Sequence, residues 1–127
     1  MAKKFTYRGK EWEEISSMSL QEFRSILPSK YRRSLKRGFT ENQKKLLLKI
    51  ISNPKKFHRT MNRQMVIIPE MVGVKIGVHN GKEYVTVEVI PEMIGHRLGE
   101  FAQTRRKVEH SAPGFGATKS SKYVPLK

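Results

Sequence analysis

Histidine and glutamate are the residues from which this chain could most readily build an acid–base or metal site, since it contains no cysteine and no aspartate. His58, His79, His96 and His110 are too widely scattered to form a metal motif. His96 could act as a general base, but no nucleophile stands at a useful spacing from it. We therefore expect no enzymatic activity, no metal and no cofactor, and we assign His96 a hydrogen-bonding or RNA-contact role.

A possible phosphate-binding loop near the C-terminus does not fit its motif. The segment GFGATKS begins at Gly114, but it lacks the G-x-x-x-x-G-K-[ST] spacing. We also expect no strand before it and no helix after it, and both are needed to position such a loop. Nucleotide binding by this segment is therefore discounted.

Positive charge is the strongest chemical signal in the chain. The formal net charge is +15, and residues 30–65 alone hold twelve basic groups and one acid, Glu41. Residues 66–100 are slightly acidic, at −2, and residues 101–127 carry +5. Charge this dense repels itself unless a polyanion compensates it. The candidate partners are therefore nucleic acid and an anionic membrane, of which we expect nucleic acid. The sequence contains no apolar run that could span a bilayer, and no membrane partner is expected.

The predicted RNA contacts are basic residues of the two flanks, with a lysine of the central hairpin and two residues that follow it. They are Lys30, Arg32, Arg33, Lys36, Arg37, Lys55, Lys56, Arg59, Arg63, Lys82, His96, Arg97, Arg105, Arg106 and Lys107. A second group mixes an aromatic ring, small residues, hydroxyls and lysines, which suits contact with folded RNA. It consists of His110, Gly114, Phe115, Gly116, Thr118, Lys119, Ser120 and Lys122.

Two capping boxes indicate where helices that position these cations begin. Ser19 with Glu22 predicts a helix that ends before Pro28, and Thr40 with Gln43 predicts a second helix that ends at Asn53-Pro54. The second helix has a broad apolar face, with lysines on its other side; the apolar residues are Leu46, Leu47, Leu48, Ile50 and Ile51. Residues 55–63 have no clean period and are interpreted as a basic connector, and QMVIIP (64–69) as a short buried strand.

A β-hairpin over residues 74–89 is the clearest local pattern. Asn80-Gly81 is the preferred dipeptide of a two-residue type I′ turn, which would pair His79 with Lys82 and Gly77 with Tyr84. One face would then be core and the other polar. The predicted core face is Val74, Ile76, Val78, Val85, Val87 and Val89.

Two nearly identical words, PEMVG (69–73) and PEMIG (91–95), flank this hairpin. We interpret the first as a turn between strands, because proline cannot donate to a sheet ladder. We interpret the second as the start of a helix, because Ile94, Leu98 and Phe101 follow at helical spacing, as does Ala102. The flanks show no further similarity, so an internal repeat is rejected.

These elements predict an α+β fold with a single small domain. A hairpin-centred antiparallel or mixed sheet would be packed by helices in residues 19–109, after a slightly basic N-terminal arm (1–18). Residues 110–127, with Pro113, Gly114 and Gly116 close together, are expected to form a flexible, extended tail.

The middle of the chain resembles the signature of the small-subunit ribosomal protein S19 family. The resemblance rests on Asn80-Gly81-Lys82, on Ile94 through Phe101 (IGHRLGEF), and on Thr104. The words PEMVG, PEMIG, PGFGATKSS and YVPLK extend it over nearly the whole chain. The N-terminal FTYRGKEWEEISSMS and the basic segment through Gly38 resemble the archaeal and eukaryotic branch more than the bacterial one.

This resemblance implies a structural protein in the head of the small ribosomal subunit, in the cytoplasm. It implies binding to the 3′ major domain of the small-subunit (16S-type) rRNA near the aminoacyl-tRNA site, beside the protein of the thirteenth small-subunit family. Contacts with tRNA and a bridge to the large subunit are possible, and the tail would lie near the decoding region. A DNA-binding or chromatin protein with the same basic flanks is the alternative, because a helix-turn-helix in residues 19–52 fits the pattern as well.

Overall fold

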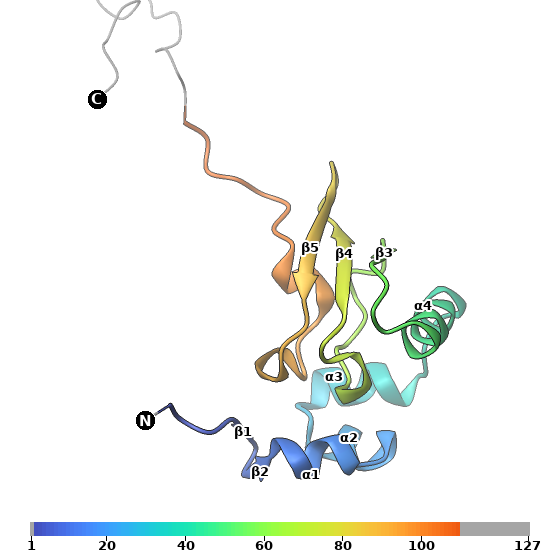
Figure 1. The fold of residues 1–127 in the computed structure, drawn as a ribbon, viewed down its shortest axis with the longest axis vertical. Coiled ribbons are helices and arrows are strands. Elements are labelled where there is room, and N and C mark those ends of the chain that lie inside the picture. Colours follow the sequence, from blue (N-terminus) through green and yellow to red (C-terminus); the bar gives the residue numbers. More distant parts are fainter. Residues whose placement is uncertain (1, 110–127) are drawn as a thin grey trace, which may run out of the picture.

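The computed structural model describes residues 2–109, which form a small α+β domain (Figure 1). Helices α1, α2 and α3 lie together at one end, a three-stranded sheet stands beyond them, and α4 lies beside strand β3 at the edge of that sheet. The helices are α1 (Trp12–Ser17), α2 (Leu20–Ile26), α3 (Ser29–Lys36) and α4 (Glu41–Ser52). The sheet has the order β3-β4-β5, from β3 (His58–Thr60), β4 (Lys75–His79) and β5 (Tyr84–Glu88).

The N-terminal segment packs on the domain. Strands β1 (Thr6–Tyr7) and β2 (Lys10–Glu11) form a small antiparallel pair that leads directly into α1. Ile15 of α1 is fully buried, and Phe5, Tyr7, Trp12 and Met18 pack against the core around it. No element was expected from the sequence here, because two-residue strands and a six-residue helix leave too few residues for a periodic pattern.

Both predicted capping boxes are present and begin α2 and α4. The Glu22 backbone N–H donates to the Ser19 hydroxyl at 3.3 Å, and the Gln43 N–H donates to the Thr40 hydroxyl at 3.4 Å. Of the predicted apolar face of α4, only part is buried: Leu46 and Ile50 are in the core, while Leu48 and Ile51 are more than half exposed. Because α4 covers only one edge of the sheet, a single stripe of the helix finds apolar partners.

The hairpin is present, but its predicted register is wrong. Tyr84 pairs with His79, and Thr86 pairs with Gly77, so four residues rather than two connect β4 and β5. The Asn80 side-chain oxygen accepts hydrogen bonds from the N–H groups of Lys82 (3.0 Å) and Glu83 (2.8 Å), and this side-chain turn replaces the predicted type I′ turn. The shift is by two residues, so the predicted core face is kept. Strand β3 runs parallel to β4, which makes the sheet mixed.

The words PEMVG and PEMIG adopt the same backbone conformation, contrary to the prediction that they serve different purposes. Each forms a short 3-10 helix, η1 (Pro69–Met71) and η2 (Pro91–Met93), and each ends at a glycine with positive φ, +87° at Gly73 and +81° at Gly95. The helix predicted from Pro91 onward is therefore wrong. Gly95 interrupts it, and a further 3-10 helix, η3 (Leu98–Phe101), follows.

Reciprocal hydrogen bonds join the two words into one unit. The Gly73 N–H donates to the Val89 carbonyl at 2.8 Å, and the Gly95 N–H donates to the Ile67 carbonyl at 3.2 Å. The Val89 and Ile67 N–H groups donate in turn to the carbonyls of Val74 and His96. The predicted strand 64–69 is thus buried, but it pairs with residues 95–99 through these bonds and one β-bridge, from Val66 to Arg97, instead of joining the sheet.

Candidate nucleic-acid interface

Helix α3 presents a continuous face of predicted RNA contacts. Leu35 anchors the helix in the core and Tyr31 is half-buried, while the basic residues all point to solvent. These exposed residues are Lys30, Arg32, Arg33, Lys36 and, just after the helix, Arg37. We call this set the α3 basic face. Its cations make no ion pairs with carboxylates within residues 2–109, so the face keeps its full charge.

A groove of about 770 Å³ runs between α4 and the segment that contains β3. Its walls carry four cations and no carboxylate. They come from the two sides, with Lys45 and Lys49 on α4, one turn apart, and Lys56 and Arg59 on the facing segment. We call this the α4–β3 groove. Three asparagines and three apolar side chains also line the groove. The full set of lining residues is Asn42, Lys45, Leu46, Lys49, Asn53, Lys56, Phe57, His58, Arg59, Thr60, Met61 and Asn62.

Arg63 turns into the protein. The side chain is half-buried, and its guanidinium donates to the carbonyls of His79, Gly99 (2.9 Å) and Ala102 (2.7 Å). These three hydrogen bonds join the hairpin, which contains His79, to η3, which contains Gly99, and to Ala102 just after η3. Arg63 was predicted as an RNA contact, and in the structure its two terminal guanidinium nitrogens both donate within the fold.

Arg97 is also engaged inside the domain. Its guanidinium donates to the Ser34 hydroxyl of α3 at 3.1 Å and to the Gln64 carbonyl at 3.3 Å, and it lies 5.4 Å from the centre of the Tyr31 ring. Its Nε is buried and has no hydrogen-bond partner among residues 2–109. Arg97 therefore fastens α3 to the segment before η3, so that it positions the α3 basic face.

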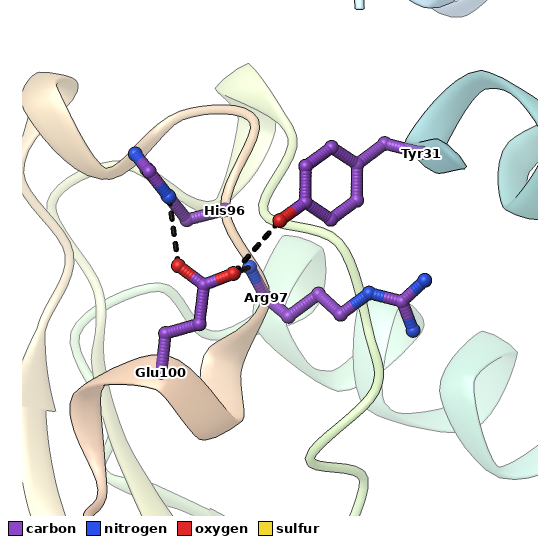
Figure 2. A network of polar contacts seen from close by, with 4 residues as sticks. All are labelled: Tyr31, His96, Arg97 and Glu100. Carbon is purple, nitrogen blue, oxygen red and sulfur yellow. Dashed lines mark hydrogen bonds and ion pairs between the residues drawn. The ribbon is translucent and has the colours of Figure 1, made fainter. Parts of the chain in front are cut away.

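Glu100 holds the same junction from the other side (Figure 2). The Tyr31 hydroxyl donates to Glu100 Oε1 at 2.8 Å, and His96 Nδ1 lies 2.7 Å from Oε2. Burial raises the pKa of the Glu100 carboxyl, but the hydrogen bonds from Tyr31, His96 and the Arg97 backbone outweigh it, so this pKa is lowered overall. The same hydrogen bond raises the pKa of the Tyr31 hydroxyl, and burial adds to that increase. The network is built to keep Glu100 charged and Tyr31 protonated.

The remaining predicted contacts lie apart from the groove. Lys82 is exposed in the hairpin loop, and Lys55 is exposed just before Lys56. Arg105, Arg106 and Lys107 are exposed in the extended segment that leaves the domain after η3 (Figure 1). The tail residues from His110 to Lys122 lie outside the described residues.

The site offers binding chemistry. Within residues 2–109, no three histidine or acidic side chains gather closely enough to hold a metal ion. The helices of this part of the chain are all too short or too polar to cross a membrane. What the arrangement provides is fixed cations with donors directed outward, on a helix face and in a groove, and such surfaces bind the phosphates of nucleic acid.

Several groove residues were missed by the sequence analysis. Lys45 and Lys49 were placed on the polar side of their helix, but their spacing of four residues already puts them on one face. Phe57 was taken as part of a connector without periodicity. Buried His58 and Thr60 in fact alternate with exposed Phe57 and Arg59, which is the period of a strand. The buried pair is polar and the exposed Phe57 is apolar, so the sequence carried no hydrophobic alternation that could have located β3.

Comparison with known protein families places this interface in context. A family model described as Ribosomal protein S19 matches residues 33–110, which is more than half of the chain. The matched region begins within α3 and includes the α4–β3 groove, the sheet, both P-E-M words and, of the Glu100 network, His96, Arg97 and Glu100 but not Tyr31.

Proposed function

Because the chain belongs to the ribosomal protein S19 family, we propose that it binds the 3′ major domain of the small-subunit rRNA, in the subunit head near the aminoacyl-tRNA site. Membership makes it a non-enzymatic, structural protein of the small ribosomal subunit that binds rRNA and serves translation. The finer placement is the proposal. It includes assignment to the archaeal and eukaryotic branch and location in cytoplasmic ribosomes.

The observation that carries this proposal is the α4–β3 groove, whose four cations have no carboxylate among the lining residues. Phosphates are the natural counter-ions for such a groove, and the α3 basic face supplies more cations of the same kind. Arg63 and Arg97, which are bound inside the fold, would then support the interface from within. Family membership favours rRNA over the DNA-binding alternative.

Salt dependence tests the phosphate contacts. If about six phosphates are neutralised, log K for folded head-domain rRNA falls with log salt at a slope of about −4 to −5. Lys45→Gln with Lys49→Gln, or Arg32→Gln with Arg33→Gln, should flatten that slope by about 1.5. Lys3→Gln with Arg8→Gln removes the same charge from the exposed N-terminal segment and is the matched control. A slope near zero for the unmodified protein, or tighter binding to duplex DNA than to this rRNA at equal salt, would refute the proposal.

We further propose that a protein of the thirteenth small-subunit family is the neighbour in the head, and that tRNA and a large-subunit bridge are close. The segment from His110 onward is proposed to reach the decoding region, as the family resemblance implies. Truncation after Glu109 should then permit incorporation into subunits, because the groove and the α3 basic face remain. The expected defect is in tRNA binding at the aminoacyl site, measured on subunits that contain the truncated protein. Normal tRNA selection by those subunits would contradict this placement.

A further inference from the structure

The outer face of the sheet carries two aromatic rings around a bare backbone position. A methyl group at Gly77 would lie 2.7 Å from Cζ of Phe57 and 3.4 Å from Cβ of Tyr84, so the Phe57 ring lies directly over this glycine. Each of the two aromatic residues is nevertheless 40% exposed. The sequence predicted that Tyr84 would pair with Gly77, but in the observed register Tyr84 pairs with His79, and the Phe57 ring is the nearest group over the glycine.

Arg59 lies on the same face of the sheet as these rings. It pairs with Gly77 across the parallel strands, and its guanidinium carbon lies 5.6 Å from the centre of the Tyr84 ring. The side chain therefore reaches from β3 across β4 to β5. His79 contacts the edge of the Tyr84 ring, with the ring centres 4.9 Å apart. Planar groups from three strands thus share one exposed face.

This face is continuous with the α4–β3 groove, because Phe57 and Arg59 belong to both. Lys45, Lys49 and Lys56 line the groove side. The nearest carboxylate on the same face of β5 is Glu88, which is paired across the sheet with Lys75, at the opposite end of the strand from Tyr84. Cations for phosphate therefore lie beside two aromatic residues that are each partly exposed.

We propose that Phe57, Arg59 and Tyr84 form a stacking platform for unpaired bases of a single-stranded RNA segment, whose phosphates follow the α4–β3 groove. This inference rests on the proposed rRNA binding and specifies its ligand. In a duplex the bases already stack on one another, so exposed rings gain nothing from it, whereas unpaired bases have free π-faces. If the rings served only to cover Gly77, Arg59 would have no need to extend over Tyr84.

The test compares three RNA probes binding to the full chain, by fluorescence anisotropy at several salt concentrations. The probes are a single strand of mixed sequence, the duplex of that sequence, and a strand of equal length with abasic sugars. Phe57→Leu and Tyr84→Leu should each weaken binding of the base-bearing strand by about fivefold to a hundredfold. They should leave binding of the abasic strand and the salt slope unchanged, because phosphate contacts remain.

Two controls separate stacking from loss of structure. Tyr84→Trp keeps a ring and should retain the affinity of the original protein. Ile90→Ala changes an apolar residue of the same 40% exposure outside the platform and should have no effect on any probe. Thermal melting of every variant shows whether the fold is intact.

Three results would overturn the platform. One is equal weakening for base-bearing and abasic strands. Another is unchanged binding of all probes by both leucine variants. The third is unchanged RNA binding combined with poorer retention of the variants in subunits, which would assign the face to a protein neighbour. Failure of the proposed function is distinguishable from all three, since the unmodified protein would then bind none of the probes in a salt-dependent way.

Discussion

The two P-E-M segments have the same backbone, yet they sit in different surroundings. A methyl group at Gly73 would meet no atom within 4 Å, whereas at Gly95 it would lie 2.7 Å from the Tyr7 hydroxyl. The glycines that follow each word differ in the same way: the movable Phe57 ring covers Gly77, and Arg63 covers Gly99. A short sequence can therefore determine its own conformation, while its neighbours decide how much a substitution costs. The predictions below compare the corresponding positions.

The largest difference is expected between Gly95→Ala and Gly73→Ala. Both place a side chain at positive φ, which costs about 1–2 kcal/mol. Gly95→Ala must also displace Tyr7 and Leu27, and overpacking adds about 1–3 kcal/mol. Urea unfolding at unchanged m-value measures both losses. Tyr7→Phe removes the obstructing hydroxyl, so it should recover part of the stability of Gly95→Ala and none of that of Gly73→Ala. Equal losses for the two alanine variants would show that the crowding at Gly95 relaxes freely.

The next comparison is between Arg63 and Phe57, the side chains that cover Gly99 and Gly77. Arg63→Leu leaves the carbonyls of His79, Gly99 and Ala102 without their charged donor, and we expect a loss of about 3 kcal/mol in the free energy of unfolding. Phe57→Leu removes only part of a half-exposed apolar contact and should cost about 1 kcal/mol. Chemical denaturation of both variants under one condition makes this comparison. A larger loss in the free energy of unfolding for Phe57→Leu than for Arg63→Leu would show that the Phe57 ring mainly stabilises the fold.

A smaller contrast is expected between Gly99→Ala and Gly77→Ala. At Gly99 the new methyl meets the Arg63 carbonyl oxygen at 3.0 Å, and this backbone atom is held by the hydrogen bond from the Gly99 N–H. We expect a loss of about 1–3 kcal/mol. At Gly77 the new methyl meets the end of the partly exposed Phe57 ring, which can rotate away. Alanine also restricts the unfolded chain, and this stabilises the protein by about 0.4–1 kcal/mol. Melting temperatures should therefore fall for Gly99→Ala and stay close to the original for Gly77→Ala.

The smallest effect concerns Glu100, whose counterpart in the first segment is the buried, uncharged Val78. Because the pKa of Glu100 is lowered in the fold, its contribution is fully present above the pKa of an unfolded glutamate, about 4.3, and is lost as the pH falls through the folded value. Glu100→Gln should cost about 1 kcal/mol or less at neutral pH, since the carboxylate is partly exposed.

Melting curves of both proteins across the acid range check the sign. The stability advantage of the original protein over Glu100→Gln should shrink as the pH falls below about 4.3. An advantage that grows on acidification would mean that the carboxyl is bound in its protonated form.

Local interactions of the chain were predictable from the sequence alone. The capping boxes at Ser19 and Thr40 are contacts between residues three apart, so they begin α2 and α4 wherever those helices pack. The alternation of the hairpin determined which of its faces is buried, since a shift of register by two residues does not change it. The charge of residues 30–65 indicated a polyanionic partner, because charge adds up regardless of fold.

Only the tertiary structure decided how distant segments use the same residue types. Residues 94–102 have the spacing of a helix, and Ile94, Leu98 and Ala102 are indeed buried. Much of the backbone of this stretch, however, bonds to residues 63–67, and only the short 3-10 helix η3 forms within it. Arg63 and Arg97 look like Arg59 in the sequence, yet carbonyls and a hydroxyl from other segments bind them inside the domain. Such partners are far away along the chain, and no local pattern records a hydrogen bond whose acceptor arrives only when the chain has folded.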